Sequence, residues 1–236
     1  KNKKLKIIVS WHADVYKKYF YIAPFLILID ILLFLISTKL VYFTPIHVKT
    51  SLFSNIKFIN KKIFIIPLCI STPKFNKIKI NNKKRFSLKN KNQIKVISIG
   101  RLVKYKGYEY ALKAISKLNN NVYYTIIGDG PLKEKINLLI RELNLTNRVT
   151  LLGEISEDAK NKELYSADIF LFPSISQSEA YGLVQLEAMF FNLPIINTNL
   201  KNGVNYLVPD NVSITCRTKN PKEIKKAILR LINNEI

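Results

Sequence analysis

Residues 168–199 read DIFLFPSISQSEAYGLVQLEAMFFNLPIINTN. A short apolar run stands at each end of this stretch, and a polar loop followed by a helix-length apolar segment lies between them. Strands that alternate with helices in this way are typical of βαβ units in a parallel sheet. The stretch therefore predicts an α/β fold.

Two carboxylates, Glu179 and Glu187, lie eight residues apart in this stretch. On one continuous helix they would be roughly 12 Å apart and about 80° around the axis, so they would not share a face. The better interpretation places Glu179 in a loop that ends at Gly182, before a helix that begins near Leu183 and carries Glu187. We therefore expect the two acids to flank a helix N-terminus, where the amides of Leu183 and Val184 can bind an anion.

The same alternation of apolar runs and amphipathic stretches continues on both sides, from residue 93 to the end of the chain. It predicts a parallel sheet covered by helices on both faces, and ligands of such sheets bind beyond the carboxyl ends of the strands. All seven glycines lie between residues 100 and 203. Nearly all of them fall at predicted strand ends, in GRLVKYKG (100–107), GDGP (128–131), GE (153–154) and PSISQSEAYG (173–182).

Residues 5–72 carry a shorter version of the pattern. Its predicted strands are LKIIVS (5–10), LVYFTP (40–45) and KIFIIPL (62–68), with a long apolar helix after the first and a short helix near residues 47–55. Three strands make an incomplete doubly wound domain.

The sequence thus predicts three segments. Residues 1–73 form a partial N-terminal Rossmann-like domain, residues 74–92 form a polar, basic linker, and residues 93–236 form a complete C-terminal Rossmann-like domain.

One apolar run, YFYIAPFLILIDILLFLI at residues 19–36, just reaches the length of a membrane-spanning helix. Asp30 near its middle would be costly in hydrocarbon, and Pro24 would break its first turns. We expect a helix that is either buried against a sheet or partly dipped into a membrane interface.

The net charge of +22 is concentrated in the first 92 residues, which hold 19 Lys and Arg but only 2 acids. Such asymmetry indicates an anionic partner, nucleic acid or an acidic membrane surface, unless it reflects only a lysine- and asparagine-rich composition. Residues 74–92 lack a nucleic-acid-binding fold signature, so we expect no nucleic-acid partner. Cys69 and Cys216 indicate neither a disulfide framework nor a zinc site, and we expect both thiols to be buried.

The carboxyl ends of the predicted strands, which form one rim of the sheet, bring three kinds of group together. Arg101 and Lys106 could clamp a diphosphate, and the helix N-terminus at Gly182 adds an anion site. Glu179 and Glu187 could accept hydrogen bonds from hydroxyls on either side of that anion. Each residue alone is more often a surface charge, but their joint order matches a sugar, a diphosphate and a ribose in line.

The segments GRLVKYKG, IIGDGP, YSADIFLFPS and SEAYGLVQLEAMFFNLPIINTN resemble the C-terminal, donor-binding half of glycosyltransferase family 4, over residues 93 to about 234. These nucleotide-sugar enzymes have two Rossmann-like domains in the GT-B fold, and the E-x7-E element is the most specific match. The resemblance implies that Glu179 contacts donor sugar hydroxyls, Glu187 the ribose, and Arg101 and Lys106 the diphosphate. It also implies retention of anomeric configuration without a metal, and the sequence has no Asp-x-Asp motif.

Two further segments extend the resemblance into the first part of the chain. IIVSWHADV (7–15) is similar to a family strand followed by a histidine, and IIPLCIS (65–71) to the segment that enters the interdomain linker. By this resemblance His12 contacts the sugar from the opposite wall and, with Glu179, is a predicted catalytic residue. A lone histidine after a strand is otherwise more often structural, which is the role we expect for His47.

The chain departs from the family pattern at Asn192, where a glycine is usual, and this changes a helix C-terminus. The glycine-rich loop and further strands of the family's N-terminal domain have no match. We therefore expect the chain to start midway through that domain and to stop before the C-terminal helix that crosses back to it, as a fragment of a longer enzyme or a decayed copy.

The resemblance implies a glycosyltransferase that moves a sugar from a nucleotide-diphosphate donor to a glycan or lipid-linked acceptor in cell-surface polysaccharide synthesis. The alternative is a non-catalytic, nucleotide-sugar-binding remnant of such an enzyme. We expect no cofactor, since the nucleotide-sugar is a substrate, and a cytoplasmic protein that is peripheral on the inner face of an anionic membrane.

Overall fold

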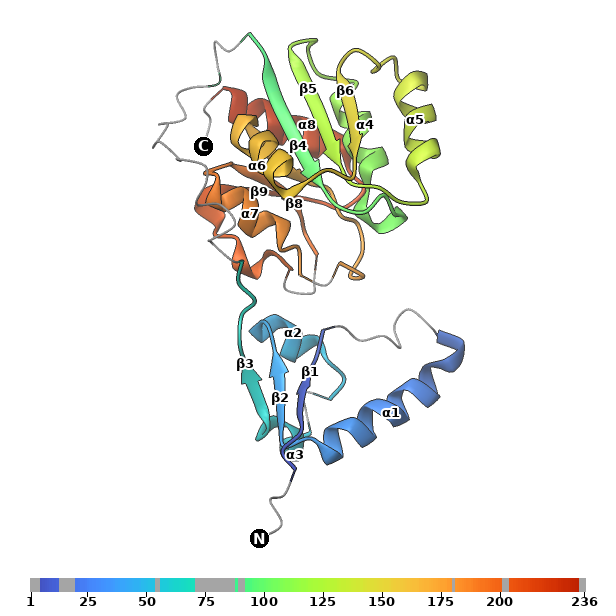
Figure 1. Ribbon diagram of the computed structural model, residues 1–236, viewed down its shortest axis with the longest axis vertical. Helices are drawn as coiled ribbons and strands as arrows, with labels where there is room; N and C mark the ends of the chain where they lie inside the picture. Colours follow the sequence, from blue (N-terminus) through green and yellow to red (C-terminus); the bar gives the residue numbers. More distant parts are fainter. Residues whose placement is uncertain are drawn as a thin grey trace.

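The computed structural model describes residues 5–12, 20–53, 56–70, 88, 92–179, 181–200 and 204–233. These residues form two lobes, each built around its own parallel sheet (Figure 1). We call residues 5–68 the N-lobe and residues 92–233 the C-lobe. The predicted domain boundaries stay predictions, and residues 74–87 and 89–91 of the predicted linker lie outside the described residues.

The N-lobe sheet has three parallel strands in the order β1-β2-β3. They are β1 (Ile8–Ser10), β2 (Lys39–Tyr42) and β3 (Ile63–Ile65), and the helices between them are α1 (Ala23–Ile36), α2 (Pro45–Thr50) and α3 (Lys57–Asn60). All three predicted strands are present. Helix α3 was not predicted, because four residues are too few to show a helical period.

Helix α1 begins at Ala23, so Pro24 lies in the first turn, where a proline needs no hydrogen-bond partner for its nitrogen. Its far end is capped by Lys62, whose Nζ donates to the carbonyl oxygens of Phe34 at 2.9 Å and Ser37 at 2.7 Å. Phe34 is the one buried residue of this helix, so of the two expectations burial against the sheet holds for only part of the helix surface, and the membrane-interface alternative stays a prediction. Within the described part of the chain, no helix is long and apolar enough to cross a membrane.

The C-lobe sheet has six parallel strands in the order β6-β5-β4-β7-β8-β9. They are β4 (Ile94–Ile99), β5 (Val122–Ile127), β6 (Val149–Gly153), β7 (Ile169–Phe172), β8 (Ile195–Thr198) and β9 (Ser213–Cys216). All four residues of β7 and of β8 are buried, as expected for central parallel strands covered on both faces. The predicted α/β class with parallel sheets is confirmed.

Five helices cover this sheet: α4 (Tyr108–Ile115), α5 (Lys133–Glu142), α6 (Glu157–Ser166), α7 (Val184–Phe190) and α8 (Pro221–Ile232). Side chains of α4, α5 and α8 pack into one core cluster with the strands, and side chains of α6 and α7 pack into another. The helices therefore lie on both faces of the sheet (Figure 1).

The strand order reverses between β4 and β7, which are neighbours at the middle of the sheet. From β4 the chain adds β5 and β6 on one side, and from β7 it adds β8 and β9 on the other. The loops that leave the carboxyl ends of β4 and β7 therefore meet at a topological switch point, the usual ligand position in such sheets.

The two cysteines are free and differ in their environment. Cys216 at the end of β9 is buried, and this burial raises the pKa of its thiol to about 11. Cys69 is exposed, so the expectation that both thiols are buried is wrong for Cys69. It follows β3, which is an edge strand of the described N-lobe sheet.

Candidate functional site

The loops after β4 and β7 are locked together by main-chain contacts. Gly107 has a φ of +68°, and a Cβ atom there would lie 2.2 Å from the carbonyl oxygen of Pro173. The amide of Ile175 donates to the carbonyl oxygen of Tyr105 at 2.7 Å. Any side chain at Gly107 would therefore push the two loops apart.

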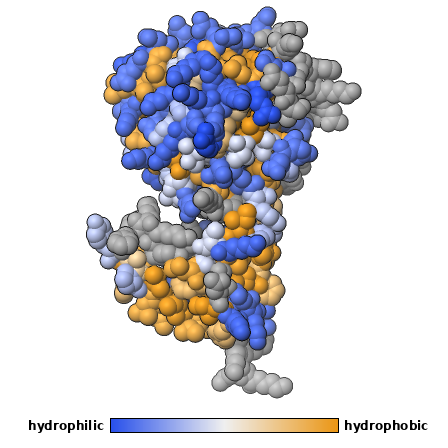
Figure 2. Space-filling view, turned by 180° about the vertical axis from the view of Figure 1, so that it is seen from behind, coloured by the Kyte–Doolittle hydropathy of each residue, from blue (hydrophilic) through white to orange (hydrophobic). Residues whose placement is uncertain are grey.

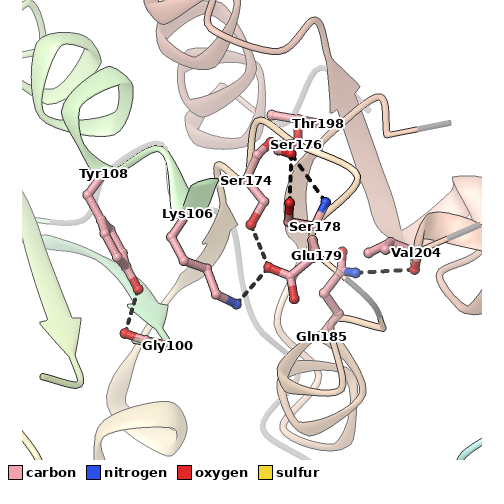
Figure 3. A network of polar contacts seen from close by, with 10 residues as sticks. All are labelled: Gly100, Lys106, Tyr108, Ser174, Ser176, Ser178, Glu179, Gln185, Thr198 and Val204. Carbon is pink, nitrogen blue, oxygen red and sulfur yellow. Dashed lines mark hydrogen bonds and ion pairs between the residues drawn. The ribbon is translucent and has the colours of Figure 1, made fainter. Parts of the chain in front are cut away.

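Glu179 lies in the loop after β7 with its side chain turned into this junction (Figure 3). It is only 6% exposed, and its Oε2 atom accepts a hydrogen bond from Ser174 Oγ at 2.8 Å. The same oxygen lies 2.7 Å from Nζ of Lys106, which comes from the loop after β4. The structure thus brings together two residues that the sequence placed on separate loops, and a charged pair of this length is strong.

Lys106 is itself enclosed. Its Nζ lies 5.4 Å from the ring centroid of Phe172 and 5.7 Å from that of Tyr105, within reach of cation–π attraction. A Cβ atom at Gly100 would lie 3.1 Å from Nζ, so the glycine leaves room for the ammonium group. The cation is therefore held by one carboxylate and two aromatic faces.

Arg101 follows directly after Gly100 and is exposed on the rim. Burial and the charge of Glu179 raise the pKa of Tyr105, and the charge of Arg101 partly opposes them. Arg101 is thus close enough to Tyr105, in the same loop, to act electrostatically on its hydroxyl. Its predicted contact with a diphosphate stays a prediction.

Helix α7 begins where the sequence predicted. Gly182 has a φ of +63°, Leu183 is the N-cap, and Val184 is the first helical residue. A Cβ atom at Gly182 would lie 2.8 Å from Nε2 of Gln185 and 2.9 Å from Cζ of Phe172. The glycine is needed both for its backbone conformation and for close packing, whereas its predicted role in anion binding stays a prediction.

Glu187 lies in the first turn of α7 and is paired with Lys160 of α6, at 2.8 Å. Lys160 also pairs with Glu157 at 3.1 Å. Burial alone would lower the pKa of Lys160, but hydrogen bonds and charges from Glu187 and Glu157 outweigh it and raise the pKa. No sequence signal marks Lys160, which lies in a polar helix with a second lysine, Lys162.

A largely buried network of hydrogen bonds connects the first turn of α7 to neighbouring strands. Nδ2 of Asn197 donates to Oε1 of Gln185 at 3.2 Å, and Oγ1 of Thr215 donates to Oδ1 of Asn197 at 2.8 Å. Gln185 Nε2 donates in turn to the carbonyl oxygen of Val204 at 3.4 Å. The network ties α7 to β8, β9 and the segment after β8, and sequence reasoning did not find it.

Tyr181 reaches from the loop after β7 across to the N-lobe. Its hydroxyl donates to the carbonyl oxygen of Phe43 at 2.8 Å and accepts from the amide of Leu68 at 3.2 Å. Its ring meets the Phe43 ring edge-on at 5.0 Å, and the ring of His12 lies 4.7 Å from the same Phe43 ring. His12 is exposed at the end of β1, so the structure places it on the side of the N-lobe that faces the C-lobe loop.

The remaining expectations concern metals and the second histidine. Among the described residues, no group of three or more His, Cys, Asp or Glu side chains could hold a metal ion. His47 is buried in α2, and its ring packs edge-on against Tyr42 at 5.4 Å, which agrees with a structural role.

The family profile described as Glycosyl transferases group 1 matches residues 79–236, which is more than half of the chain. The chain belongs to this family. Glu179, Lys106 and Glu187 all lie inside the matched region.

Three proteins with names or solved structures are similar to this chain. An uncharacterized glycosyltransferase of Haemophilus influenzae is 32% identical over 151 residues, which cover 62% of this chain and 41% of the relative. An N-acetylgalactosamine-N,N'-diacetylbacillosaminyl-diphospho-undecaprenol 4-alpha-N-acetylgalactosaminyltransferase of Campylobacter jejuni is 30% identical over 116 residues, 49% of this chain and 31% of the relative. The crystal structure of Anabaena HepE in complex with UDP has a TM-score of 0.75 at 17% identity, covering 98% of this chain and 63% of that chain.

The likeness to HepE shows the fold, as does the likeness to the lipopolysaccharide outer core galactosyltransferase WaaB, which has a TM-score of 0.68 at 17% identity. The chain spans less than half of the two curated relatives named above. The predicted incompleteness of the N-terminal domain stays a prediction.

Proposed function

We propose that the chain is the donor-binding part of a retaining, metal-independent glycosyltransferase of family 4. It would take a sugar from a nucleotide-diphosphate donor and pass it to a glycan or lipid-linked acceptor in cell-surface polysaccharide synthesis. The observation that carries the proposal is the buried ion pair of Lys106 and Glu179 at the switch point of the sheet, with Glu187 one helical turn into α7.

The charges of this pair suggest how a donor would bind. With no ligand, Glu179 neutralises Lys106 in an enclosed position. An arriving diphosphate can replace the carboxylate as the partner of Lys106, with Arg101 beside it on the rim. Glu179 is then left to accept hydrogen bonds from the sugar hydroxyls, and Glu187 to accept them from the ribose.

The chemistry proposed for this arrangement is mainly electrostatic. When the bond between the sugar and the diphosphate breaks, negative charge grows on the departing diphosphate, and preorganised cations at Lys106 and Arg101 stabilise it. The acids and His12 hold the sugar and nucleoside in position. The leaving diphosphate itself takes the proton of the acceptor hydroxyl, and no cofactor is required.

Two relatives support this choice of substrates. The solved structure of HepE is a complex with UDP, and the name of the Campylobacter jejuni relative describes transfer of N-acetylgalactosamine to an undecaprenol-linked acceptor. Both fit a nucleotide-sugar donor and a lipid-linked or glycan acceptor for the present chain.

Calorimetric titration of UDP and GDP into the chain tests the proposal. We expect one nucleotide to bind, Glu187→Ala to weaken binding at least tenfold, and Glu142→Ala at an exposed position of α5 to leave binding unchanged. A folded chain that binds neither nucleotide would contradict the proposal. The enzyme that contains the whole family region can also be assayed for sugar transfer. If it binds the nucleotide but transfers no sugar, the non-catalytic alternative is favoured.

We also propose that the N-lobe binds the inner face of an anionic membrane. Apolar side chains are exposed along α1 and the segment before it: Tyr21, Ile22, Phe25, Leu28, Ile29, Ile31, Leu32, Leu35 and Ile36. Figure 2 shows the N-lobe as a largely hydrophobic surface. Apolar side chains on a helix combined with a strongly basic segment are typical of interfacial membrane binding.

Vesicle flotation tests the membrane proposal. We expect the chain to float with anionic vesicles at low salt and not with zwitterionic ones. Leu28→Glu with Leu32→Glu should abolish flotation, whereas Leu138→Glu, equally exposed on α5 of the C-lobe, should not. Absence of flotation with anionic vesicles would remove the membrane claim.

A further inference from the structure

Tyr181 belongs to the donor loop by sequence but makes its polar contacts with the other lobe. It lies two residues after Glu179 and directly before Gly182. Its side chain is 8% exposed, and its hydroxyl bonds to main-chain groups of the N-lobe, at Phe43 and Leu68. A tyrosine buried for its ring alone would not need this hydroxyl.

The two partners follow neighbouring strands of the N-lobe sheet. Phe43 comes directly after β2, and Leu68 comes shortly after β3. Tyr181 therefore uses one oxygen, as donor and as acceptor, to bridge the carboxyl ends of two strands that end at the same sheet edge. Burial raises the pKa of Tyr181 further above its ordinary value of 10, so the hydroxyl is protonated and able to donate at neutral pH.

The same contact links the donor loop to His12 through Phe43. The Phe43 ring contacts both side chains, 4.7 Å from the ring of His12 and 5.0 Å from the ring of Tyr181. A shift of Tyr181 would move Phe43, and with it the wall that carries His12, away from Glu179. Since a displacement of about 1 Å can cost about a hundredfold in rate, such a bridge matters for transfer.

We propose that Tyr181 is a positioning residue that clamps the N-lobe to the donor loop and so sets the spacing between His12 and Glu179. Tyr181 is not among the predicted nucleotide contacts, which are Arg101, Lys106, Gly182, Leu183, Val184 and Glu187. Its role in transfer rests on the proposed function, but its mechanical role can be tested without turnover.

The variant Tyr181→Phe keeps the ring and its packing on Phe43 and removes only the hydroxyl. Hydrogen exchange at the Leu68 amide, which donates to that hydroxyl, is the direct readout. We expect exchange at Leu68 to be about fivefold or more faster in Tyr181→Phe. Tyr123→Phe, at the amino end of β5 and away from the rim, is the matched control and should leave it unchanged.

Two further measurements separate positioning from simple stability. Nucleotide affinity, measured by calorimetry, should stay within about twofold in Tyr181→Phe, whereas kcat of the enzyme should fall about tenfold at unchanged donor KM. The proposal is overturned if the Leu68 amide exchanges at the same rate in Tyr181→Phe and Tyr123→Phe. It is also overturned if Tyr181→Phe leaves kcat unchanged. A wild-type chain that binds no nucleotide contradicts the proposed function instead, and the exchange comparison still decides whether the clamp exists.

Discussion

At the scale of single residues, the ion pair of Lys106 and Glu179 is the most consequential contact in the C-lobe. Two opposite charges lie 2.7 Å apart, with side chains that are 11% and 8% exposed. Taking either charge out of water is costly, and each offsets the cost for the other. Removing one partner leaves the other charge buried without its counter-ion, so each single loss should be unfavourable.

We predict that Lys106→Met lowers the free energy of unfolding by about 3 kcal/mol, because it leaves the Glu179 carboxylate without its cation. Glu179→Gln should also destabilise, and the double variant should lose about 1–3 kcal/mol less than the sum of the two single losses. Urea unfolding of the four proteins measures this coupling.

Lys133 provides the control for this cycle. Its pair with Asp129 has the same 2.7 Å length but is exposed on the surface, so Lys133→Met should change stability little. Strictly additive losses at Lys106 and Glu179 would contradict the claim that they stabilise each other.

The sequence was sufficient for some site residues and not for others. Glu179, Gly182 and Glu187 could be placed because a glycine after a polar loop and before a periodic apolar segment is a local signal of a helix start. The sequence could not show that Lys106 pairs with Glu179 or that Lys160 pairs with Glu187, because the two members of each pair come from separate loops or helices. Their positions depend on strand order and helix packing, which local periodicity does not contain.

Asn192 offers a second prediction at this scale. It follows α7 with a φ of +55°, the left-handed conformation that glycine adopts most easily. We expect Asn192→Gly to leave stability equal or raise it by a few tenths of a kcal/mol, and Asn192→Ala to lower it by about 1 kcal/mol. Thermal unfolding measures both, and Asn144, with the same φ after α5, should respond in the same way. An alanine variant as stable as the glycine variant would contradict this account.

At the scale of elements, α8 shows how a helix start is fixed by side chains. Asn220 Oδ1 accepts from the amide of Glu223 at 3.2 Å, and the amide of Arg217 donates to Glu223 Oε2 at 2.7 Å. The backbone and guanidinium hydrogen bonds of Arg217 lower the pKa of Glu223 below 4.5. The ionised form of the Glu223 carboxylate thus stabilises the first turn of α8.

This lowered pKa predicts a pH dependence of stability. The contribution of Glu223 is fully present above its unfolded pKa of about 4.5 and is lost as the pH falls through the lower folded pKa. We therefore expect the melting temperatures of wild type and Glu223→Gln to differ at pH 6 and to converge well below pH 4.5. Glu142→Gln on exposed α5 is the control, and a difference that persists unchanged at pH 3 would refute the assignment.

Most helices and strands could be predicted from the sequence, because buried strands and amphipathic helices differ in their hydrophobic period. Strands such as β7 and β8 are short, wholly buried runs, and helices such as α8 carry a clear apolar face, so their periodicities differ sharply. Strand β9 was missed because SITC at residues 213–216 is short and partly exposed at the sheet edge. Helix α1 was predicted, but which of its apolar side chains are exposed could not be, since exposure depends on what the rest of the N-lobe covers.

At the scale of the whole molecule, the two lobes differ greatly in the core that supports them. The N-lobe core contains Trp11, Phe34, Leu40, Tyr42, Phe53 and Ile59 among its described residues. The C-lobe has two larger clusters, one on each face of a six-stranded sheet. A lobe that buries less apolar surface has less free energy to offset its chain entropy, so the N-lobe should open first.

The single tryptophan of the chain, Trp11, makes this difference measurable. It is buried in the N-lobe against Phe34, whereas most helical residues, and hence most of the far-ultraviolet circular dichroism, belong to the C-lobe. We expect the Trp11 emission to change at a lower urea concentration than the circular dichroism does. Tyr181→Phe should lower the urea midpoint of the Trp11 emission further and leave the midpoint of the circular dichroism unchanged. The reason is that it removes the hydrogen bonds that tie the less stable N-lobe to the C-lobe. Coincident midpoints in wild type would mean that the lobes unfold as one cooperative unit. A Trp11 midpoint that Tyr181→Phe leaves unchanged would mean that the clamp adds nothing to the stability of the N-lobe.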